Sequence, residues 1–305
     1  MARRRRGLPV NGVLLLDKPA GLSSNHALQR ARRLFQAQKA GHTGTLDPMA
    51  TGLLPVCFGE ATKFSAHLLD ADKVYRTRVE LGTTTDTGDA EGRVVERHEV
   101  PRLTGADVEG VLERFHGEIE QVPPMYSALK HQGRRLYELA REGRSIERAA
   151  RRVTVYDARL LSLADTAFDL DVRVSKGTYI RTLAEDIGKV LGCGAHISAL
   201  RRLATGPFTG EGMMTLDALE ARAGQAEREA VLLPVDVLVD HLPRLEVTGP
   251  AARQLTHGQA ARVETGELAG DETARLYCEG AFLGLGVVAG PQEVAPKRLL
   301  NTAAD

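Results

Sequence analysis

Strand-like patterns recur along the upstream part of the chain. Residues 13–16 and 53–58 are short apolar runs, which are typical of buried strands. Residues 75–81 and 168–174 alternate apolar and polar side chains, as strands with one wet face do. These segments predict a sheet with a buried face, and residues 83–92 are predicted to form a polar loop beside it.

Apolar positions at helical spacing predict helices between these strands. Ser23 or Ser24 can cap the first helix, and Thr104 opens a later one with Asp107 in the capping-box position. The apolar faces of these two helices are Ala27, Leu28, Ala31, Leu34 and Phe35, and Val108, Val111, Leu112 and Phe115. Further helices are predicted over residues 60–69, 183–191 and 197–203. The alternation of helices and strands indicates a mixed α/β catalytic part.

The pattern changes near His241-Leu242-Pro243, where we place a domain boundary. Beyond it the chain consists of short, glycine-rich segments such as residues 281–288. These segments predict a small β-rich module of about 60 residues, which is near the lower size limit for an independent core. The sequence is therefore divided into residues 1–242 and residues 243–305.

Composition narrows the class of protein. A chain of 305 residues with 43% hydrophobic residues is long enough for two domains with a sizeable core, and its formal net charge is zero. Cys57, Cys193 and Cys278 lie far apart without a CxxC motif, which argues against a disulfide framework or a zinc knuckle and fits a reducing cytosol. Arg3 to Arg6 is followed by too short an apolar run for a signal peptide, and no window approaches the roughly 18 apolar residues of a membrane span. We expect a cytoplasmic protein without membrane contact.

Residues 41–52 contain three glycines and one carboxylate, Asp47, and have neither a helical nor a strand period. Asp47 is the only acid between Asp17 and Glu60. A lone carboxylate in a shaped loop suits a reaction with one nucleophile or one general base. The alternative is that Asp47 caps a helix whose first residue is Pro48, which is a common pairing.

Two further stretches carry candidate chemistry. Between Lys130 and Arg152, eight basic residues stand against three acidic ones, which suits phosphate binding; the alternative is a solvated helix with charge pairs.

If residues 175–181 are extended, Tyr179 and Arg181 point the same way, and Arg181 could keep Asp47 ionised in a dry pocket. The alternative there is a strand-to-helix corner with surface polar groups.

Motifs of other enzyme classes are absent from the sequence. It contains no GxxxxGK[ST] loop, no GxGxxG spacing, no HExxH and no GxSxG. No cluster of histidine and cysteine suggests a metal site.

Several long motifs, in order, resemble the family of bacterial tRNA pseudouridine synthase B enzymes, the tRNA pseudouridine(55) synthases. They lie at residues 12–19, 41–48, 59–63, 125–130, 175–181, 200–203 and 295–299, together with Tyr75. The resemblance covers nearly the whole chain. It implies an α+β fold with a mixed, mainly antiparallel sheet flanked by helices, followed by a PUA-like RNA-binding domain. Asn25-His26 departs from the family pattern, where an acid would follow the asparagine.

The resemblance also implies roles for residues. Asp47 is the catalytic aspartate, Tyr75 stacks on the target base and is a candidate for proton abstraction, and Arg181 pairs with Asp47. The implied substrate-binding residues are His42, Tyr179, Leu200, Lys18, Lys63 and Lys130. Among them His42 would fill the gap left by the flipped base, and the basic segment at about residues 124–152 would be an insertion that closes over the tRNA.

The implied reaction breaks the C1′–N1 bond of the T-loop uridine at position 55 and forms a C1′–C5 bond. It changes no oxidation state, so neither cofactor nor metal is expected, and the partner is the T-arm stem-loop of tRNA bound by a monomer. Asp47 could attack C1′ or assist departure of uracil by removing a ribose proton. Two alternatives stay open, namely a pseudouridine synthase for another RNA and a tRNA-folding chaperone that acts without catalysis.

Overall fold

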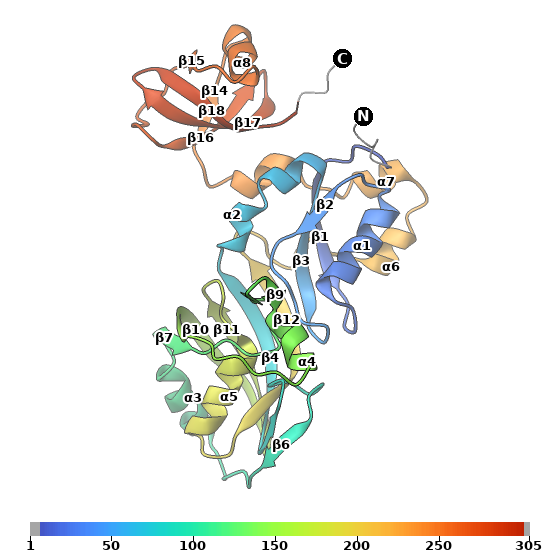
Figure 1. Ribbon diagram of the computed structural model, residues 1–305, viewed down its shortest axis with the longest axis vertical. Helices are drawn as coiled ribbons and strands as arrows, with labels where there is room; N and C mark the ends of the chain where they lie inside the picture. Colours follow the sequence, from blue (N-terminus) through green and yellow to red (C-terminus); the bar gives the residue numbers. More distant parts are fainter. Residues whose placement is uncertain (1–6, 302–305) are drawn as a thin grey trace.

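Two sheets organise the chain in the computed structural model, which describes residues 7–301 (Figure 1). A nine-stranded sheet runs through the larger part, and a five-stranded sheet forms the module drawn in red at one end. The predicted absence of a signal peptide concerns Arg3 to Arg6, which lie outside the described residues. Within residues 7–301 no helix is both long and apolar enough to cross a membrane.

The large sheet is mixed and mainly antiparallel, as the resemblance implies. Its strands follow the order β13-β1-β3-β12-β4-β11-β10-β7, with β2 paired to β3. Only the pairs β1–β13 and β3–β12 are parallel. The strands are β1 (Gly12–Lys18), β2 (Ala40–His42), β3 (Thr51–Phe58), β4 (Lys73–Leu81), β7 (Gly117–Gln121), β10 (Arg151–Ala164), β11 (Ala167–Val174), β12 (Ala195–Thr205) and β13 (Met214–Thr215).

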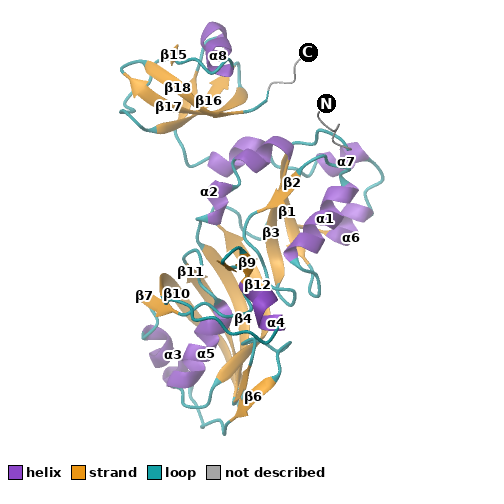
Figure 2. Cartoon of the chain, in the orientation of Figure 1, coloured by secondary structure: helices purple, strands orange, loops and turns teal. Residues whose placement is uncertain are grey.

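Helices flank this sheet (Figure 2). Helices α1 and α6 pack beside β1 and β3, and α3 and α5 pack beside β10 and β12. The predicted caps of two helices are confirmed: Ser23 accepts from the main-chain N–H of His26, and Thr104 and Asp107 form a capping box. The helices are α1 (Ser24–Leu34), η1 (Gly59–Lys63), α2 (Ala66–Leu69), α3 (Gly105–Glu113), α4 (Leu136–Arg141), α5 (Ile180–Val190), α6 (Leu216–Glu220), α7 (Gln225–Glu229) and η2 (Val235–Val239).

Strand β4 shows the predicted alternation. Tyr75, Thr77 and Val79 are buried, while Arg76 lies on the opposite face and donates to both carboxylate oxygens of Asp171 at 2.8 Å. Two small hairpins stand apart from the sheet: β5 (Thr83–Thr85) with β6 (Val94–Arg97), and β8 (Lys130–His131) with β9 (Arg134–Arg135).

The terminal module is β-rich, as predicted. It consists of β14 (Arg244–Glu246), α8 (Gly249–Thr256), β15 (Ala261–Arg262), β16 (Thr273–Cys278), β17 (Ala281–Gly290) and β18 (Glu293–Leu299). Phe282 of β17 packs against Phe64, with ring centroids 5.6 Å apart. Lys63 donates to the Leu299 carbonyl at 2.8 Å, and the main-chain N–H of Asn301 donates to Glu60 at 2.6 Å. The module is thus joined to the large sheet by both apolar and polar contacts.

One predicted helix is wrong, and a second is interrupted. Residues 197–203 belong to β12, and a bulge between Ile197 and Ala199 places Ile197 and Leu200 on the same face. A strand with a bulge therefore mimics the three-residue spacing of a helix. The helix predicted over residues 60–69 is broken into η1 and α2, because the chain leaves helical geometry at Phe64.

Gly52 is where the 41–52 loop returns to the sheet, and its geometry gives a test of the fold. Its φ is +96°, and an added Cβ would lie 2.3 Å from the Arg202 carbonyl oxygen. We expect Gly52→Ala to lower the free energy of unfolding by more than about 2 kcal/mol, because strain and overlap add. Gly110→Ala, in an open position of α3, is the control and should stabilise by up to about 1 kcal/mol. Urea unfolding measures both; equal effects would contradict the expectation.

Candidate active site

A cavity of about 240 Å³ opens beside the 41–52 loop. Five residues that the sequence nominated line it: Asp47, Tyr75, Tyr179, Arg181 and Leu200. They come from a loop, two strands and the start of one helix. The fold therefore gathers into one pocket side chains that are up to about 150 residues apart in the chain.

The 41–52 segment is mostly a loop, although β2 takes up its first two residues and β3 its last two. No helix follows Asp47; the chain makes a turn in which the N–H of Ala50 donates to the Asp47 carbonyl at 3.1 Å. The alternative that Asp47 caps a helix is therefore wrong. Ser24, at the start of α1, fixes the residue before Asp47, because its hydroxyl bonds the Leu46 carbonyl at 3.0 Å and the Leu46 N–H at 2.7 Å.

Lys18 lies beneath this loop and not in the cavity. Its side chain is fully buried, and its ammonium donates to the carbonyls of Pro19, Leu22 and Pro48 at 2.9, 2.6 and 3.1 Å. Burial lowers the pKa of Lys18 to about 8, against the attraction of Asp47. Since all three donors are engaged, the expected contact of Lys18 with substrate is not supported, and its place is that of a support for the turn.

Arg181 is the partner of Asp47. Its Nε lies 3.0 Å from Asp47 Oδ2, and its Nη2 lies 3.2 Å from Oδ1. It also donates to the carbonyls of Thr87 and Tyr126, each at 2.7 Å, and its side chain is only 3% exposed. Of the two alternatives for residues 175–181, the strand-to-helix corner is the correct one, because β11 ends at Val174 and α5 begins at Ile180. The corner aims Arg181 at Asp47 all the same.

Asp89 completes a charged group that the sequence reasoning missed. Its Oδ2 lies 3.8 Å from Arg181 Nε, and its Oδ1 accepts from Thr87 Oγ1 at 2.6 Å. It lies in the segment at residues 83–92, which the sequence marked only as a polar loop. Burial raises the pKa of Asp47 above its ordinary value, Asp89 raises it further, and Arg181 opposes both.

The two tyrosines stand on separate supports. Tyr179 precedes α5, and Gln121 of β7 bonds both its N–H (3.0 Å) and its carbonyl (3.2 Å). Burial raises the pKa of the Tyr179 phenol, so it stays protonated at neutral pH. Tyr75 is on β4, where Leu200 of β12 pairs with the residue two positions further on, Thr77. Tyr75 and Leu200 therefore lie on one face of the sheet.

Three other nominated residues do not line the cavity. His42 ends β2, its Nδ1 is buried without a partner among the described residues, and burial lowers its pKa, so the ring is neutral at pH 7. Lys63 is engaged at the contact with the terminal module, where it also pairs with Glu60 at 2.6 Å. Lys130 is exposed in the β8–β9 hairpin.

The basic segment is only partly neutralised. Arg134 pairs with Glu142, and Arg152 with Glu118. The guanidinium groups of Arg135 and Arg141 lie 5.8 and 5.4 Å from the ring of Tyr137, and neither forms a salt bridge with a carboxylate of residues 7–301. Ser127, at the base of this segment, lines the cavity, and the neighbouring Tyr126 carbonyl holds Arg181. The insertion is thus tied to the Asp47 pocket.

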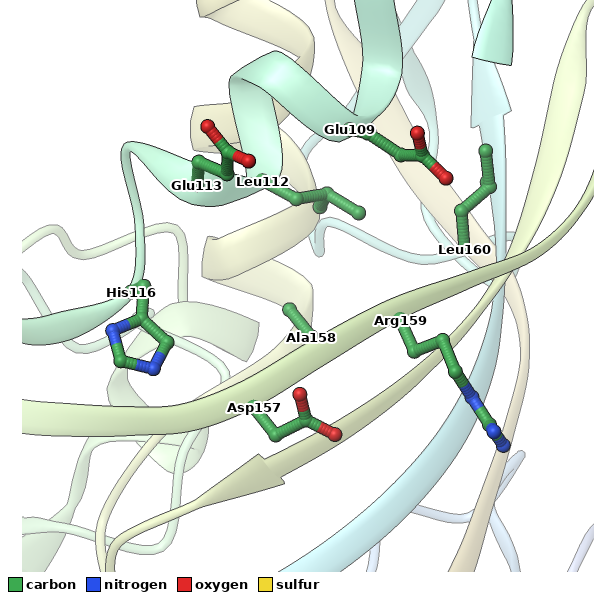
Figure 3. A pocket seen from close by; sticks show the side chains of 8 residues that line it. All are labelled: Glu109, Leu112, Glu113, His116, Asp157, Ala158, Arg159 and Leu160. Atoms are coloured by element: carbon green, nitrogen blue, oxygen red, sulfur yellow. The ribbon is translucent and has the colours of Figure 1, made fainter. Parts of the chain in front are cut away.

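A larger hollow of about 490 Å³ lies elsewhere, between α3 and β10 (Figure 3). Glu109, Glu113 and Asp157 line it together with His116 and Arg159. None of the nominated residues lies there. Across the part of the chain that the structure describes, no group of three or more histidine, cysteine or acidic side chains is placed to hold a metal ion.

Asn25 and His26 are both exposed on α1. The contact of this helix with the 41–52 loop is made by Ser24, through Leu46. The departure from the family pattern therefore leaves the support of Asp47 intact.

Comparisons with known proteins agree along the chain. Residues 32–180 match the N-terminal domain of TruB family pseudouridylate synthases, residues 181–240 match the tRNA pseudouridylate synthase B C-terminal domain, and residues 243–300 match the pseudouridine synthase II TruB C-terminal domain. The tRNA pseudouridine synthase B of Chromohalobacter salexigens is 68% identical, with 100% of this chain and 99% of that protein covered. That of Azoarcus sp. is 56% identical, with 96% of each covered. The crystal structure of a Cbf5-Nop10-Gar1 complex contains a chain of the same fold, with a TM-score of 0.70 and 26% identity, covering 96% of this chain and 85% of that one.

The charge group around Asp47 makes a prediction about its titration. We expect the Asp47 pKa to lie above the ordinary 3.8, to rise further in Arg181→Gln, and to fall in Asp89→Asn. The sign follows because a nearby cation favours the carboxylate and a nearby anion disfavours it. Carboxyl-carbon NMR titration measures the three values. Shifts of the same direction in both variants would mean that the charges do not act as the geometry implies.

Proposed function

This chain belongs to the TruB family of pseudouridine synthases and is a tRNA pseudouridine synthase, an isomerase; from that premise we propose that it converts the T-loop uridine at position 55 of tRNA, with Asp47 as the catalytic group. The observation that carries this proposal is the ion pair of Asp47 and Arg181 at the wall of the cavity. A carboxylate held in this way supports chemistry at the sugar, while the cavity beside it suits a single flipped base.

The role of Asp47 follows from its surroundings. Arg181 holds both oxygens of the carboxyl and opposes the rise in its pKa that burial causes. The side chain remains one-third exposed through the cavity, so a ribose can reach it. An ionised carboxylate there can attack C1′ or take a ribose proton as the C1′–N1 bond breaks. Neither route changes an oxidation state, so no cofactor is required.

Flipping the uridine out of its stack costs a few kcal/mol, and three residues fit the task of offsetting it. Tyr75 and Leu200 present an aromatic ring and an apolar side chain on one face of the pocket. The neutral imidazole of His42 suits insertion into the gap that the base leaves, since an uncharged ring stacks without the desolvation penalty of a cation. Tyr75 is also a candidate for proton removal, since it lines the cavity.

The insertion and the terminal module would hold the RNA. Exposed cations of the insertion, Lys130 among them, suit phosphates of the T-arm. We assign catalysis to residues 1–242, with the insertion at about 124–152, and PUA-like RNA binding to residues 243–305; the start of the five-stranded sheet at Arg244 supports this division. A complete pocket within one chain fits a monomer, and a tRNA substrate fits a cytoplasmic enzyme.

The first test compares wild type with Asp47→Asn on a transcribed T-arm stem-loop. We expect pseudouridine at the T-loop position from wild type only, with tRNA affinity nearly unchanged in the variant, because the amide keeps the shape but loses the charge. Mass spectrometry of RNA fragments and filter binding give the two readouts. Pseudouridine formation by the variant would contradict the catalytic role of Asp47. Binding without product from either protein would favour the chaperone alternative, and neither binding nor product would point to another RNA.

The second test concerns the insertion. Reversing Arg141, Arg144 and Arg148 to Glu should weaken T-arm binding at least tenfold and flatten its dependence on salt, because fewer counterions are released. The matched control reverses Arg93, Arg97 and Arg102 around β6, which changes the net charge equally at exposed positions. Filter binding from 50 to about 300 mM salt would show the difference. If both triple variants lose the same amount of T-arm affinity, the effect comes from net charge in general and not from the insertion.

A further inference from the structure

Two consecutive arginines on β12 face opposite sides of the sheet. Arg201 pairs in register with Arg76 on the outer face and donates to both oxygens of Asp17, at 3.0 and 2.8 Å. Arg202 pairs in register with Tyr75 and lines the cavity. Side chains of directly opposed residues lie close together on one face. Arg202 is therefore a neighbour of the aromatic ring on which the base is proposed to stack.

Arg202 is buried but has a donor to spare. Its side chain is 1% exposed, its Nε donates to the Leu53 carbonyl at 2.6 Å, and its Nη2 donates to the Gly44 carbonyl at 3.2 Å. Its third nitrogen, Nη1, makes no hydrogen bond to residues 7–301 and lies against Gly44, where a Cβ would be 3.3 Å away. Gly44 also lines the cavity. Because Arg202 and Gly44 both line the cavity, the unengaged Nη1 lies at the cavity wall.

The other cations around the cavity are already committed. Arg181 is shared among Asp47 and the carbonyls of Thr87 and Tyr126. Lys18 donates to three carbonyls, and Lys73 donates to the carbonyls of Leu69 and Ala71. Arg202 is the guanidinium in this group that combines burial with an unengaged nitrogen. A charge-assisted hydrogen bond is stronger in such a water-poor site than in solution.

The reaction generates an anion on the departing base. When the C1′–N1 bond breaks, its electron pair moves to the uracil ring and is shared between N1 and the two carbonyl oxygens. The C5–C1′ bond then forms, and the C5 proton is lost while N1 gains one, so the net change moves one proton and oxidises nothing. The negative charge on the departing base is greatest before the new bond forms, and donors placed at such a charge lower the barrier.

We propose that Arg202 Nη1 donates a hydrogen bond to a carbonyl oxygen of the flipped uracil and stabilises the anion that leaves C1′. The assignment rests on the proposed function. It makes Arg202 a catalytic residue for the base half of the reaction, as Asp47 is for the sugar half. Arg181 would then act on the carboxylate of Asp47 and not on the base.

The test varies the leaving group. Fluorine at C5 lowers the basicity of the departing uracil, so its cleavage should depend less on a cation. In single-turnover assays on T-arm stem-loops, Arg202→Gln should slow the reaction of uridine by roughly 10²–10³-fold. For 5-fluorouridine, the fold reduction in rate caused by Arg202→Gln should be smaller than that for uridine by a factor of about ten or more. Arg202→Lys keeps the charge and should therefore recover part of the rate on uridine.

The neighbouring Arg201→Gln is the matched control, and it should react with both substrates at nearly the wild-type rate. If Arg202→Gln slows both substrates equally, or Arg202→Lys is no faster than Arg202→Gln on uridine, Arg202 only shapes the loop through Gly44 and Leu53, and the proposal is wrong. If the Gln variant lacks a cooperative thermal transition, Arg202→Lys against wild type on the same two substrates decides. Failure of wild type itself to form pseudouridine would overturn the proposed function instead.

Discussion

The pocket depends on a buried guanidinium that must have all its partners in place. Arg181 is almost completely enclosed, and burying such a cation without acceptors would cost several kcal/mol. Its acceptors come from three loops, at Asp47, Thr87 and Tyr126, none of which is near α5 in sequence. The same side chain that favours the ionised form of Asp47 therefore fixes the positions of the polar loop and the base of the insertion. The geometry of the Asp47 pocket and the folding of these loops are coupled through Arg181.

Supports beneath the loop extend this coupling to main-chain atoms. Lys18 binds the Pro48 carbonyl, Ser24 binds both polar groups of Leu46, and Arg202 binds the Gly44 carbonyl. The residues on either side of Asp47 are thus held from β1, α1 and β12. These hydrogen bonds hold an irregular loop rigidly against the sheet and α1. Such rigidity is needed to keep the single carboxylate of Asp47 in a fixed position.

The parts of the fold and the site that depend on local sequence patterns could be predicted from the sequence. The alternation of β4 and the capping box at Thr104 depend on neighbours in the chain, and both were predicted correctly. The bulge at Ile197 misled, because a shift of one residue changes a strand period into an apparent helical one. Asp89 was missed because its importance comes only from the 3.8 Å distance between its Oδ2 and Arg181 Nε. The sequence of a threonine-rich loop contains no pattern that predicts this contact. Arg202 was hidden for a similar reason, since only the strand register separates it from Arg201.

The position of Lys63 shows that residues of one sequence motif can have different roles. It lies in one of the stretches on which the resemblance rests, yet its ammonium binds Glu60 and the Leu299 carbonyl at the contact with the terminal module. Because Phe282 packs on Phe64 next to it, a polar tie and an apolar contact act on the same short helical turn. The turn leads into α2, whose last residue, Leu69, lines the cavity. Residues 59–69 therefore contact the terminal module at one end and the cavity at the other, so this segment links the two parts of the molecule.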